Sequence, residues 1–322
     1  MDLRTVEILR QLNNRFYEAC AEAFSQTRQG AWEGWKACLP FIQNAYAKNP
    51  GEEQGSHCGS GAEKLCRGQW ERGEEQGVNC DSAAEKLRRS QWERGVEQGS
   101  HCGSVVLGAD ERLSLFDLAC GNGRFEAFLA DELPAVVADI VAVDSCNTLM
   151  KKARTPQVSF REFDALEALV RNEPWSQRFP ACDVAVSFGF FHHIPSSGLR
   201  NRALSELLSL VRPGGLVIVS LWCFLEDERL SRKAKRAHER ALAALGERFA
   251  AEGVSLADEL EPGDCFLGWQ DAEELWRYCH SFDDAQASEL ASSVADTADE
   301  VARFRADGKS GKLNIYLVLR KH

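Results

Sequence analysis

The chain has 322 residues, a net charge of −11 and 44% apolar residues, enough to fill the core of one large domain. No run of about 18 uncharged apolar residues is present, so we expect no membrane-spanning helix. The N-terminus also lacks the basic start and apolar stretch of a secretory signal. The acidic total excludes a generally basic surface for nucleic acid, although not a local patch. Twelve cysteines scattered through apolar segments indicate reduced thiols and a cytoplasmic protein.

A tandem repeat separates a helical segment, expected in residues 1–50, from a regular region that begins at residue 105. "EEQGSHCGSGAEKLCRGQWERG" (52–73) is followed by "EEQGVNCDSAAEKLRRSQWERG" (74–95), and 16 of the 22 positions match. Each copy has one tryptophan and one leucine as its main apolar residues, which is too little to bury a core. We therefore expect residues 51–104 to form a flexible, polar insertion.

The repeat also duplicates cysteines, two of them preceded by histidine, which raises the question of a metal site. Cys58, Cys80 and Cys102 are spaced by 22 residues, and His57 and His101 precede the first and the third. This spacing follows from the duplication itself, and structural zinc sites usually bring their cysteines in close pairs. We predict no metal here.

After residue 104, apolar strand candidates alternate with helical patterns. The strand candidates are 114–118, 139–143, 157–162, 183–188, 215–222 and 313–319, and the helical patterns include "RFEAFLADEL", "LRNRALSELLSLV" and "AQASELASSVA". Such alternation predicts an α/β fold, in which a mostly parallel sheet is covered on both faces. Ligands of these folds bind outside the carboxyl ends of the strands, where the strand order reverses.

The first strand candidate runs into a turn of small residues, "DLACGNG" (117–123). A dinucleotide fingerprint would require a glycine three positions after Gly123, and none is present. Asp117 would repel a pyrophosphate, but it can accept a hydrogen bond from an ammonium group or a water molecule. The small residues at 119, 121 and 123 let the backbone pass close to a nucleoside. Taken alone, the turn fits a purely structural role equally well.

The order of the following motifs favours a ligand role. "IVAVDS" ends the second strand candidate at Asp144, where a carboxylate can accept both ribose hydroxyls, and "VSFREFDAL" ends the third at Asp164. A helix cap is the simpler interpretation of either aspartate alone. Together with "CDVAVSFGFFHHIP" and "LVRPGGLVIVSLW", however, the series resembles the class I S-adenosylmethionine-dependent methyltransferases. That family has glycine where Ala119 stands, a mild departure that narrows the pocket or shifts the turn.

The flanks resemble a narrower group, the tRNA wobble-uridine carboxymethyl methyltransferases. The resemblance covers residues 15–40 and 105–320. It is carried by "RFYEACAEAFSQTRQGAWEGW", "FHHI", "SLWCFLED", "PGDCFLGWQ", "RYCHSFDDAQASEL" and "KLNIYLVLRK". It implies a doubly wound, Rossmann-like sheet of seven strands in residues 105–322, with residues 1–50 covering the site of the cofactor, S-adenosyl-L-methionine.

The resemblance also implies site residues. Those expected to bind the cofactor are Arg28, Asp117, Ala119, Cys120, Gly121, Gly123, Asp144, Asp164 and Ser187. Those expected to position the acceptor are His192, His193, Trp222 and Tyr278, with His280 as a further candidate. Backbone-satisfied histidines and simple packing are the structural alternatives for the second set. Arg28 or Arg277 can pair with an acidic group.

The acceptor of that group is a carboxylate on a modified uridine of tRNA, which is ionised at neutral pH and needs no general base. Residues 229–240, "RLSRKAKRAHER", carry six basic residues that can contact phosphates, or else form a solvated helix face balanced by Glu226, Asp227 and Glu228. The eukaryotic relatives also work with a small activating protein. The alternatives are a methyltransferase of a small carboxylic acid or other metabolite, which the acidic charge favours, and a non-catalytic cofactor-binding regulator.

Overall fold

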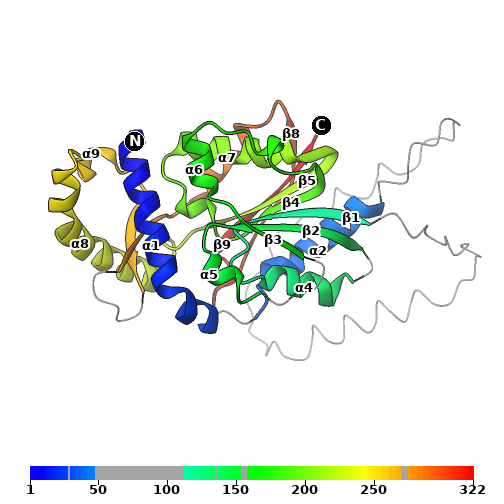
Figure 1. The fold of residues 1–322 in the computed structure, drawn as a ribbon, viewed down its shortest axis with the longest axis horizontal. Coiled ribbons are helices and arrows are strands. Elements are labelled where there is room, and N and C mark those ends of the chain that lie inside the picture. Colours follow the sequence, from blue (N-terminus) through cyan, green and yellow to red (C-terminus); the bar gives the residue numbers. More distant parts are fainter. Residues whose placement is uncertain (28–29, 48–111, 135, 154, 156–157, 270–274) are drawn as a thin grey trace, which may run out of the picture. The chain divides into compact units, whose positions relative to one another are not determined.

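The structure is a computed structural model that describes residues 1–27, 30–47, 112–134, 136–153, 155, 158–269 and 275–322 (Figure 1). Arg28 and the whole predicted insertion, residues 51–104 with their histidines and cysteines, lie outside the described residues. The described residues before and after that segment belong to one compact unit.

A seven-stranded sheet forms the centre of this unit (Figure 1). Its strands, in spatial order, are β3 (Val158–Glu162), β2 (Val137–Asp144), β1 (Leu113–Leu118), β4 (Cys182–Ser187), β5 (Val211–Trp222), β9 (Asn314–Lys321) and β8 (Ala298–Ala306). The first five strands are parallel, and β9 pairs antiparallel with both β5 and β8. The predicted fold, a doubly wound and mostly parallel α/β sheet, is confirmed.

The central strands are apolar on both sides because helices cover both faces of the sheet. Val184, Ala185 and Val186 of β4 are fully buried, as the interior of a parallel sheet requires. Along β1 the side chains alternate: Leu115 packs into the cluster on one face, and Phe116 into the cluster on the other. This alternation joins the two halves of the core through the sheet.

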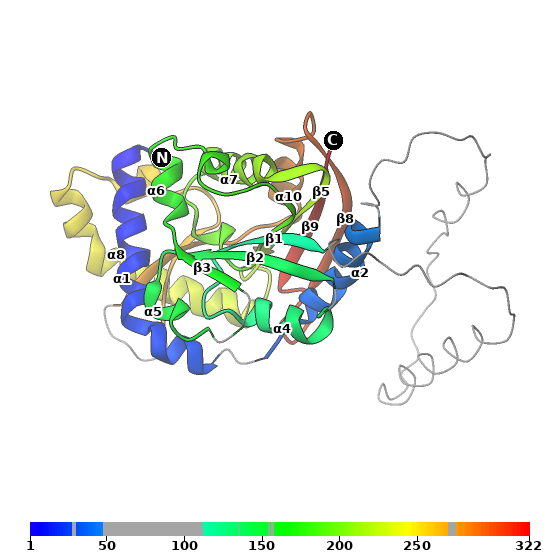
Figure 2. The same cartoon turned by 45° about the vertical axis from the view of Figure 1, so that its right-hand side comes forward.

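The helices divide between these two faces. α2 (Glu33–Ala47) and α4 (Arg124–Glu132) pack on one face, and α6 (Ala165–Val170), α7 (Ser197–Leu210) and α10 (Asp284–Ser292) pack on the other. The short helices η2 (Trp175–Gln177) and η3 (Phe191–His193) flank β4 in the chain. Figure 2 shows both layers with the sheet between them.

A smaller layer stands beside the main sheet. It consists of a two-stranded antiparallel sheet, β6 (Asp264–Gly268) with β7 (Trp276–His280), and the helices α8 (Glu228–Ala251) and α9 (Leu256–Glu259). α1 (Leu3–Thr27) packs against this layer through Leu9 and Leu12, and it also contacts α6 and α5 (Asn147–Met150) (Figure 1). α1 therefore bridges the small layer and the end of the main sheet.

Two strands of the main sheet differ from the predicted elements. β5 begins at Val211, so the predicted Pro-Gly-Gly turn lies inside the strand, where the register against β4 shifts. The β4 backbone passes too close for a side chain at Gly215, since an added Cβ would lie 2.7 Å from the Asp183 carbonyl oxygen. β8 was not among the strand candidates, because it is an edge strand with a charged, largely exposed sequence. Within the described residues, no helix is long and apolar enough to cross a membrane.

Candidate functional site

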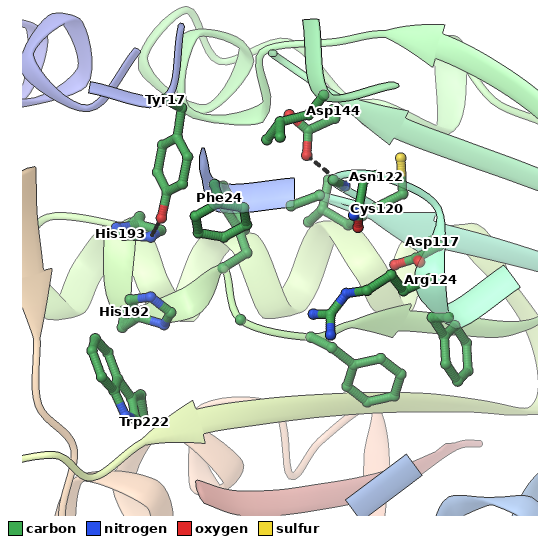
Figure 3. A pocket seen from close by; sticks show the side chains of 18 of the residues that line it. Tyr17, Phe24, Asp117, Cys120, Asn122, Arg124, Asp144, His192, His193 and Trp222 are labelled. Carbon is green, nitrogen blue, oxygen red and sulfur yellow. Dashed lines mark hydrogen bonds between the residues drawn. The ribbon is translucent and has the colours of Figure 1, made fainter. Parts of the chain in front are cut away.

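A cavity of about 510 Å³ opens at the carboxyl ends of β1, β2, β4 and β5. Tyr17 and Phe24 of α1 and Trp32 before α2 form part of its wall, so the segment predicted in residues 1–50 contributes directly to it (Figure 3). This is the place where the strand order reverses from β1 to β4, and where ligands of such sheets bind.

The turn after β1 passes along the cavity in a left-handed backbone conformation. Ala119, Gly121 and Gly123 have φ angles of 64°, 60° and 74°. An added Cβ at Gly121 would meet nothing within 4 Å, whereas one at Gly123 would lie 2.7 Å from the Ala153 Cβ. Gly121 therefore leaves the cavity open, while Gly123, which does not line the cavity, allows Ala153 and Phe160 to pack closely against the turn.

Replacing Ala119 with glycine should stabilise the protein. Its φ of 64° is in the region where an L side chain costs about 1–2 kcal/mol relative to glycine. We expect thermal unfolding of the variant to shift upward by about 2–6 °C, measured by differential scanning calorimetry. A lower unfolding temperature would show that the methyl group of Ala119 makes packing contacts that outweigh the backbone strain.

Asp144 ties the turn after β1 to the loop after β2. Its carboxylate accepts hydrogen bonds from the backbone amides of Gly121, at 2.9 Å, and Cys146, at 2.7 Å (Figure 3). Burial raises its pKa to about 6, although both amides act in the opposite direction. Asp144 lines the cavity, so its remaining acceptor positions can receive hydrogen bonds from a ligand.

Asp164, just after β3, caps a helix, which was the alternative interpretation, and it also lines the cavity, as the predicted role in cofactor binding requires. Its Oδ1 caps α6 by accepting from the Glu167 amide at 3.0 Å. Its Oδ2 accepts from Arg10 and, at 3.0 Å, from Asn14, both on α1. Asp164 lines the cavity, but its carboxylate is already engaged by these three donors.

A chain of hydrogen bonds fixes His193 at the opposite wall (Figure 3). Its Nδ1 lies 3.0 Å from the Tyr278 carbonyl oxygen, and its Nε2 lies 2.6 Å from the Tyr17 hydroxyl. A carbonyl can only accept, so Nδ1 carries the proton and Nε2 accepts from the hydroxyl. Arg277 in turn donates to the same hydroxyl at 2.7 Å. The order of donation is therefore Arg277 to Tyr17, Tyr17 to His193, and His193 to the backbone.

His192 and Trp222 complete this wall. Their ring centroids are 5.0 Å apart, and the centroids of His192 and His193 are 4.0 Å apart. Both His192 and Trp222 line the cavity, together with Asp117 and Cys120 from the turn (Figure 3).

Three other candidates point elsewhere. The Tyr278 hydroxyl donates to Asp264 at 2.6 Å in the packed interior, and His280 Nδ1 lies 2.7 Å from the same carboxylate oxygen. Ser187 donates to the Leu118 carbonyl oxygen at 3.2 Å and is fully buried. None of the three lines the cavity. The expectation that Tyr278 and Ser187 face the ligand is therefore not met.

His192, His193 and Cys279 come close together, with ligand atoms within 4.8 Å of one another. Burial raises the pKa of the Cys279 thiol to about 12 and thus favours its protonated form. A metal ion here would also have to displace the hydrogen bond from His193 Nδ1 to the Tyr278 carbonyl and lie near the Arg277 guanidinium. We assign no metal to this cluster.

Arg124 lines the cavity but was not among the site residues expected from the sequence. Arg124, the first residue of α4, extends over the stacked rings of Trp32 and Trp35, with its Cζ 5.7 and 5.3 Å from their centroids. It donates to the Gly30 carbonyl at 2.9 Å, and burial lowers its pKa to about 10. One signal was available: a basic residue is unusual in the first turn of a helix, where the helix dipole favours acids.

The family described as "Methyltransferase domain" matches residues 85–266, which is more than half of the chain. The chain belongs to this methyltransferase family. The cavity of the methyltransferase lies at the end of the sheet where its cofactor, S-adenosylmethionine, was predicted to bind.

Curated relatives match part of the methyltransferase. The tRNA (carboxymethyluridine(34)-5-O)-methyltransferase of Mus musculus is 29% identical over 119 residues, which cover 37% of this chain and 16% of that protein. The enzyme of the same name from Arabidopsis thaliana is 25% identical over 114 residues, 35% of this chain and 25% of that protein. A putative methyltransferase of Encephalitozoon cuniculi is 29% identical over 129 residues, covering 39% and 50%. The chain therefore spans less than two thirds of the length of each of these relatives.

Solved structures of similar backbone include methyltransferases. One is a SAM-dependent methyltransferase of Methanosarcina mazei, 15% identical, with a TM-score of 0.46 over 67% of this chain and 94% of that one. Another is a DhpI–SAH complex, 13% identical, with a TM-score of 0.47 over 97% of each chain.

Proposed function

We propose that this methyltransferase converts a carboxylate to its methyl ester, and that the carboxylate belongs to a carboxymethyl-type wobble uridine of tRNA. The observation that carries the proposal is Arg277, a buried cation at the cavity wall that has no carboxylate partner among the described residues.

Arg277 lies in an aromatic environment. Its side chain is only 5% exposed. Four ring centroids lie 5.0–5.9 Å from its Cζ, those of Phe16, Tyr17, Trp222 and Trp269. Burial by itself lowers the pKa of Arg277, but contacts with Tyr17 and nearby thiols raise it overall, so the group stays charged. A buried charge is costly unless it is paired. An acceptor carboxylate would supply the missing partner with the fork geometry that guanidinium favours.

In this proposal the donor occupies the opposite part of the cavity. Asp144 accepts hydrogen bonds from the ribose hydroxyls, and the open backbone at Gly121 lies along the nucleoside. Ala119, Cys120 and Asp117 face the methionine moiety. These roles leave out Gly123 and Ser187, which do not line the cavity, and Asp164, which lines it but whose carboxylate is engaged by other donors.

Little further chemistry is required of side chains. An ionised carboxylate attacks the sulfonium methyl directly, so the protein has to align oxygen, methyl and sulfur and exclude water. His193 fits a positioning role rather than that of a general base, since its Nε2 already accepts from Tyr17. The aromatic rings around Arg277 support exclusion of water from the reacting carboxylate.

Two observations support tRNA as the carrier of that carboxylate. The names of the mouse and Arabidopsis relatives specify a carboxymethyluridine at position 34 of tRNA. The six basic residues in the first half of α8 are all exposed, namely Arg229, Arg232, Lys233, Lys235, Arg236 and Arg240. Of the three acids that might balance them, Glu226 pairs with Arg305 and Asp227 caps α8, which leaves Glu228 exposed in the first turn. This arrangement favours a phosphate-binding role for the helix over a self-compensated surface.

Changing Arg232, Lys233, Lys235 and Arg236 together to alanine should weaken tRNA binding and make it less dependent on salt. Each phosphate contact contributes about one unit to the slope of log affinity against log salt, so we expect the slope to fall by up to about four units. Filter binding at several salt concentrations measures this. S-adenosylmethionine affinity should stay the same, since α8 supplies no residue of the cavity.

A control with the same change in net charge replaces four exposed basic residues on other elements, Arg15, Lys36, Lys309 and Lys312. It should retain most of the affinity and salt slope. Equal effects of the two quadruple variants would mean that only total charge matters, and would remove α8 as the RNA surface.

The function itself is tested by mass analysis of tRNA nucleosides from a deletion strain. We expect loss of the uridine methyl ester and accumulation of the free carboxymethyl nucleoside, both reversed by the wild-type gene. An unchanged nucleoside profile would contradict the tRNA proposal and favour the second candidate, a small carboxylic acid, which the same Arg277 could bind.

The eight described cysteines are free thiols, which supports the proposed cytoplasmic location. The need for a small activating protein stays a prediction.

A further inference from the structure

Glu126, on the first turn of α4, is a fully buried acid just behind the cavity wall. In the described part of the chain no donor reaches either of its carboxyl oxygens. The acid that acts on it most closely is Asp117 at the end of β1, and the two carboxyl groups influence each other electrostatically. Asp117 is 2% exposed and lines the cavity. Two buried carboxyl groups that interact in this way repel each other when both are ionised, which favours a proton on one of them.

The surroundings favour that proton. Burial, first of all, and then the mutual proximity of the two acids raise the pKa of Asp117, and burial raises the pKa of Glu126 to about 7. Asp144 on β2 adds further negative charge nearby, and the Cys120 thiol beside the pair is protonated because burial raises its pKa. The nearest cation on α4, Arg124, is directed to the Gly30 carbonyl and the rings of Trp32 and Trp35. No described basic residue forms an ion pair with either acid.

We propose that Asp117 and Glu126 form a proton-linked receptor for the positive charge of the methyl donor. In the empty cavity the pair holds one proton and one negative charge. When a cationic ligand occupies the cavity next to Asp117, the shared proton leaves to water and both carboxylates ionise. The step breaks one O–H bond of the pair and transfers that proton to the solvent. This inference rests on the proposed use of S-adenosylmethionine.

The receptor gives the site a means of distinguishing donor from product. S-adenosylmethionine carries an ammonium and a sulfonium charge, whereas S-adenosylhomocysteine has lost the sulfonium charge. The more positive ligand stabilises the doubly ionised pair more strongly. Because binding of the donor releases a proton, its affinity should rise with pH through neutrality, by up to about tenfold per pH unit for one proton. The affinity of the product should rise less.

Isothermal titration calorimetry of the full chain at pH 7, in buffers with different ionisation enthalpies, measures the released protons directly. We expect release of up to about one proton with S-adenosylmethionine, less with S-adenosylhomocysteine and least with adenosine. Adenosine brings the ribose to Asp144 but no positive charge. Since the pKa of Asp144 is about 6, that group is already mostly ionised at pH 7.

Two variants test whether Glu126 is responsible for the proton that is released when the donor binds. Glu126→Gln removes one acid of the pair and can donate an amide hydrogen bond that favours ionised Asp117 against its burial, so donor binding should release less proton and depend less on pH between pH 6.5 and 8 than in the wild type. Glu132→Gln makes the same chemical change at an exposed position of the same helix and should behave as wild type.

The outcomes separate this inference from the proposed function. Donor binding with equal proton release in wild type and Glu126→Gln would overturn the inference and leave the methyl donor assigned. Absence of any S-adenosylmethionine binding to the wild type would overturn both. If Glu126→Gln does not fold, the wild-type comparison decides: equal proton release with S-adenosylmethionine and adenosine contradicts the receptor.

Discussion

Replacing Arg277 with methionine is expected to lower kcat/KM for methyl-ester formation by about 30- to 1000-fold, with little change in S-adenosylmethionine affinity. Methionine keeps the unbranched shape among the aromatic rings but removes the charge that we propose to bind the acceptor carboxylate. Loss of a buried, charge-paired hydrogen-bonding partner costs about 2–4 kcal/mol, which corresponds to this range of rates. Steady-state kinetics with modified tRNA and calorimetry with the donor measure the two quantities.

Two further substitutions show whether charge or packing is responsible. Arg277→Lys keeps a positive charge but loses the two-pronged geometry, so it should recover part of the rate. Tyr17→Phe removes the hydroxyl to which Arg277 donates while keeping the ring, and should reduce the rate much less than Arg277→Met. Near wild-type activity of Arg277→Met would exclude this guanidinium as the carboxylate partner.

Asp144→Ala should weaken S-adenosylmethionine binding by about 1–3 kcal/mol, roughly 5- to 150-fold, because a charged acceptor of hydroxyl hydrogen bonds is lost. The pH dependence of the wild type should follow the same group. With a pKa of about 6, Asp144 becomes protonated as the pH falls through 6, and adenosine affinity should decrease there. Calorimetry from pH 5 to 7.5 measures both effects.

Asp139→Asn, an exposed acid on the same strand, is the matched control and should leave affinity unchanged.

The free energy of unfolding of the ligand-free protein should change with pH in the direction opposite to the ligand affinity. Because folding raises the pKa of Asp144, the ionised group destabilises the ligand-free protein, an effect that is absent below pH 3.8 and grows as the pH rises to about 6. The unfolding temperature of the wild type should therefore fall relative to that of Asp144→Asn as the pH rises from about 4 to about 7. An unchanged donor affinity in folded Asp144→Ala would remove the residue from the site.

The sequence predicted the buried parallel strands well because their side chains face helices on both sides, so each appears as a continuous apolar run. It missed β8, whose charged residues face solvent at the sheet edge. For the site, chain order located Asp144 and Asp164 at the cavity, since Asp144 ends β2 and Asp164 lies two residues after β3.

Side-chain direction limited the remaining predictions. Adjacent residues of a strand point to opposite faces, and on β7 Arg277 faces the cavity while Tyr278 points into the interior toward Asp264. The family resemblance indicated both residues as site candidates but could not show which of them faces the cavity. Glu126 was missed for a related reason: an acid in the first turn of a helix usually indicates a solvated position favoured by the helix dipole. Only the packing of α4 against the sheet shows that it is buried.

Under the proposed function, the depth of Arg277 also restricts the shape in which an RNA can react. Arg277 is 5% exposed and lies among four aromatic rings, so a carboxylate on a stacked base could not reach it. The nucleotide must rotate out of its stack, as bases do in other enzymes that modify them, and this costs least in an unpaired loop. An anticodon held in a duplex should consequently be a poor substrate even when its modified uridine is present.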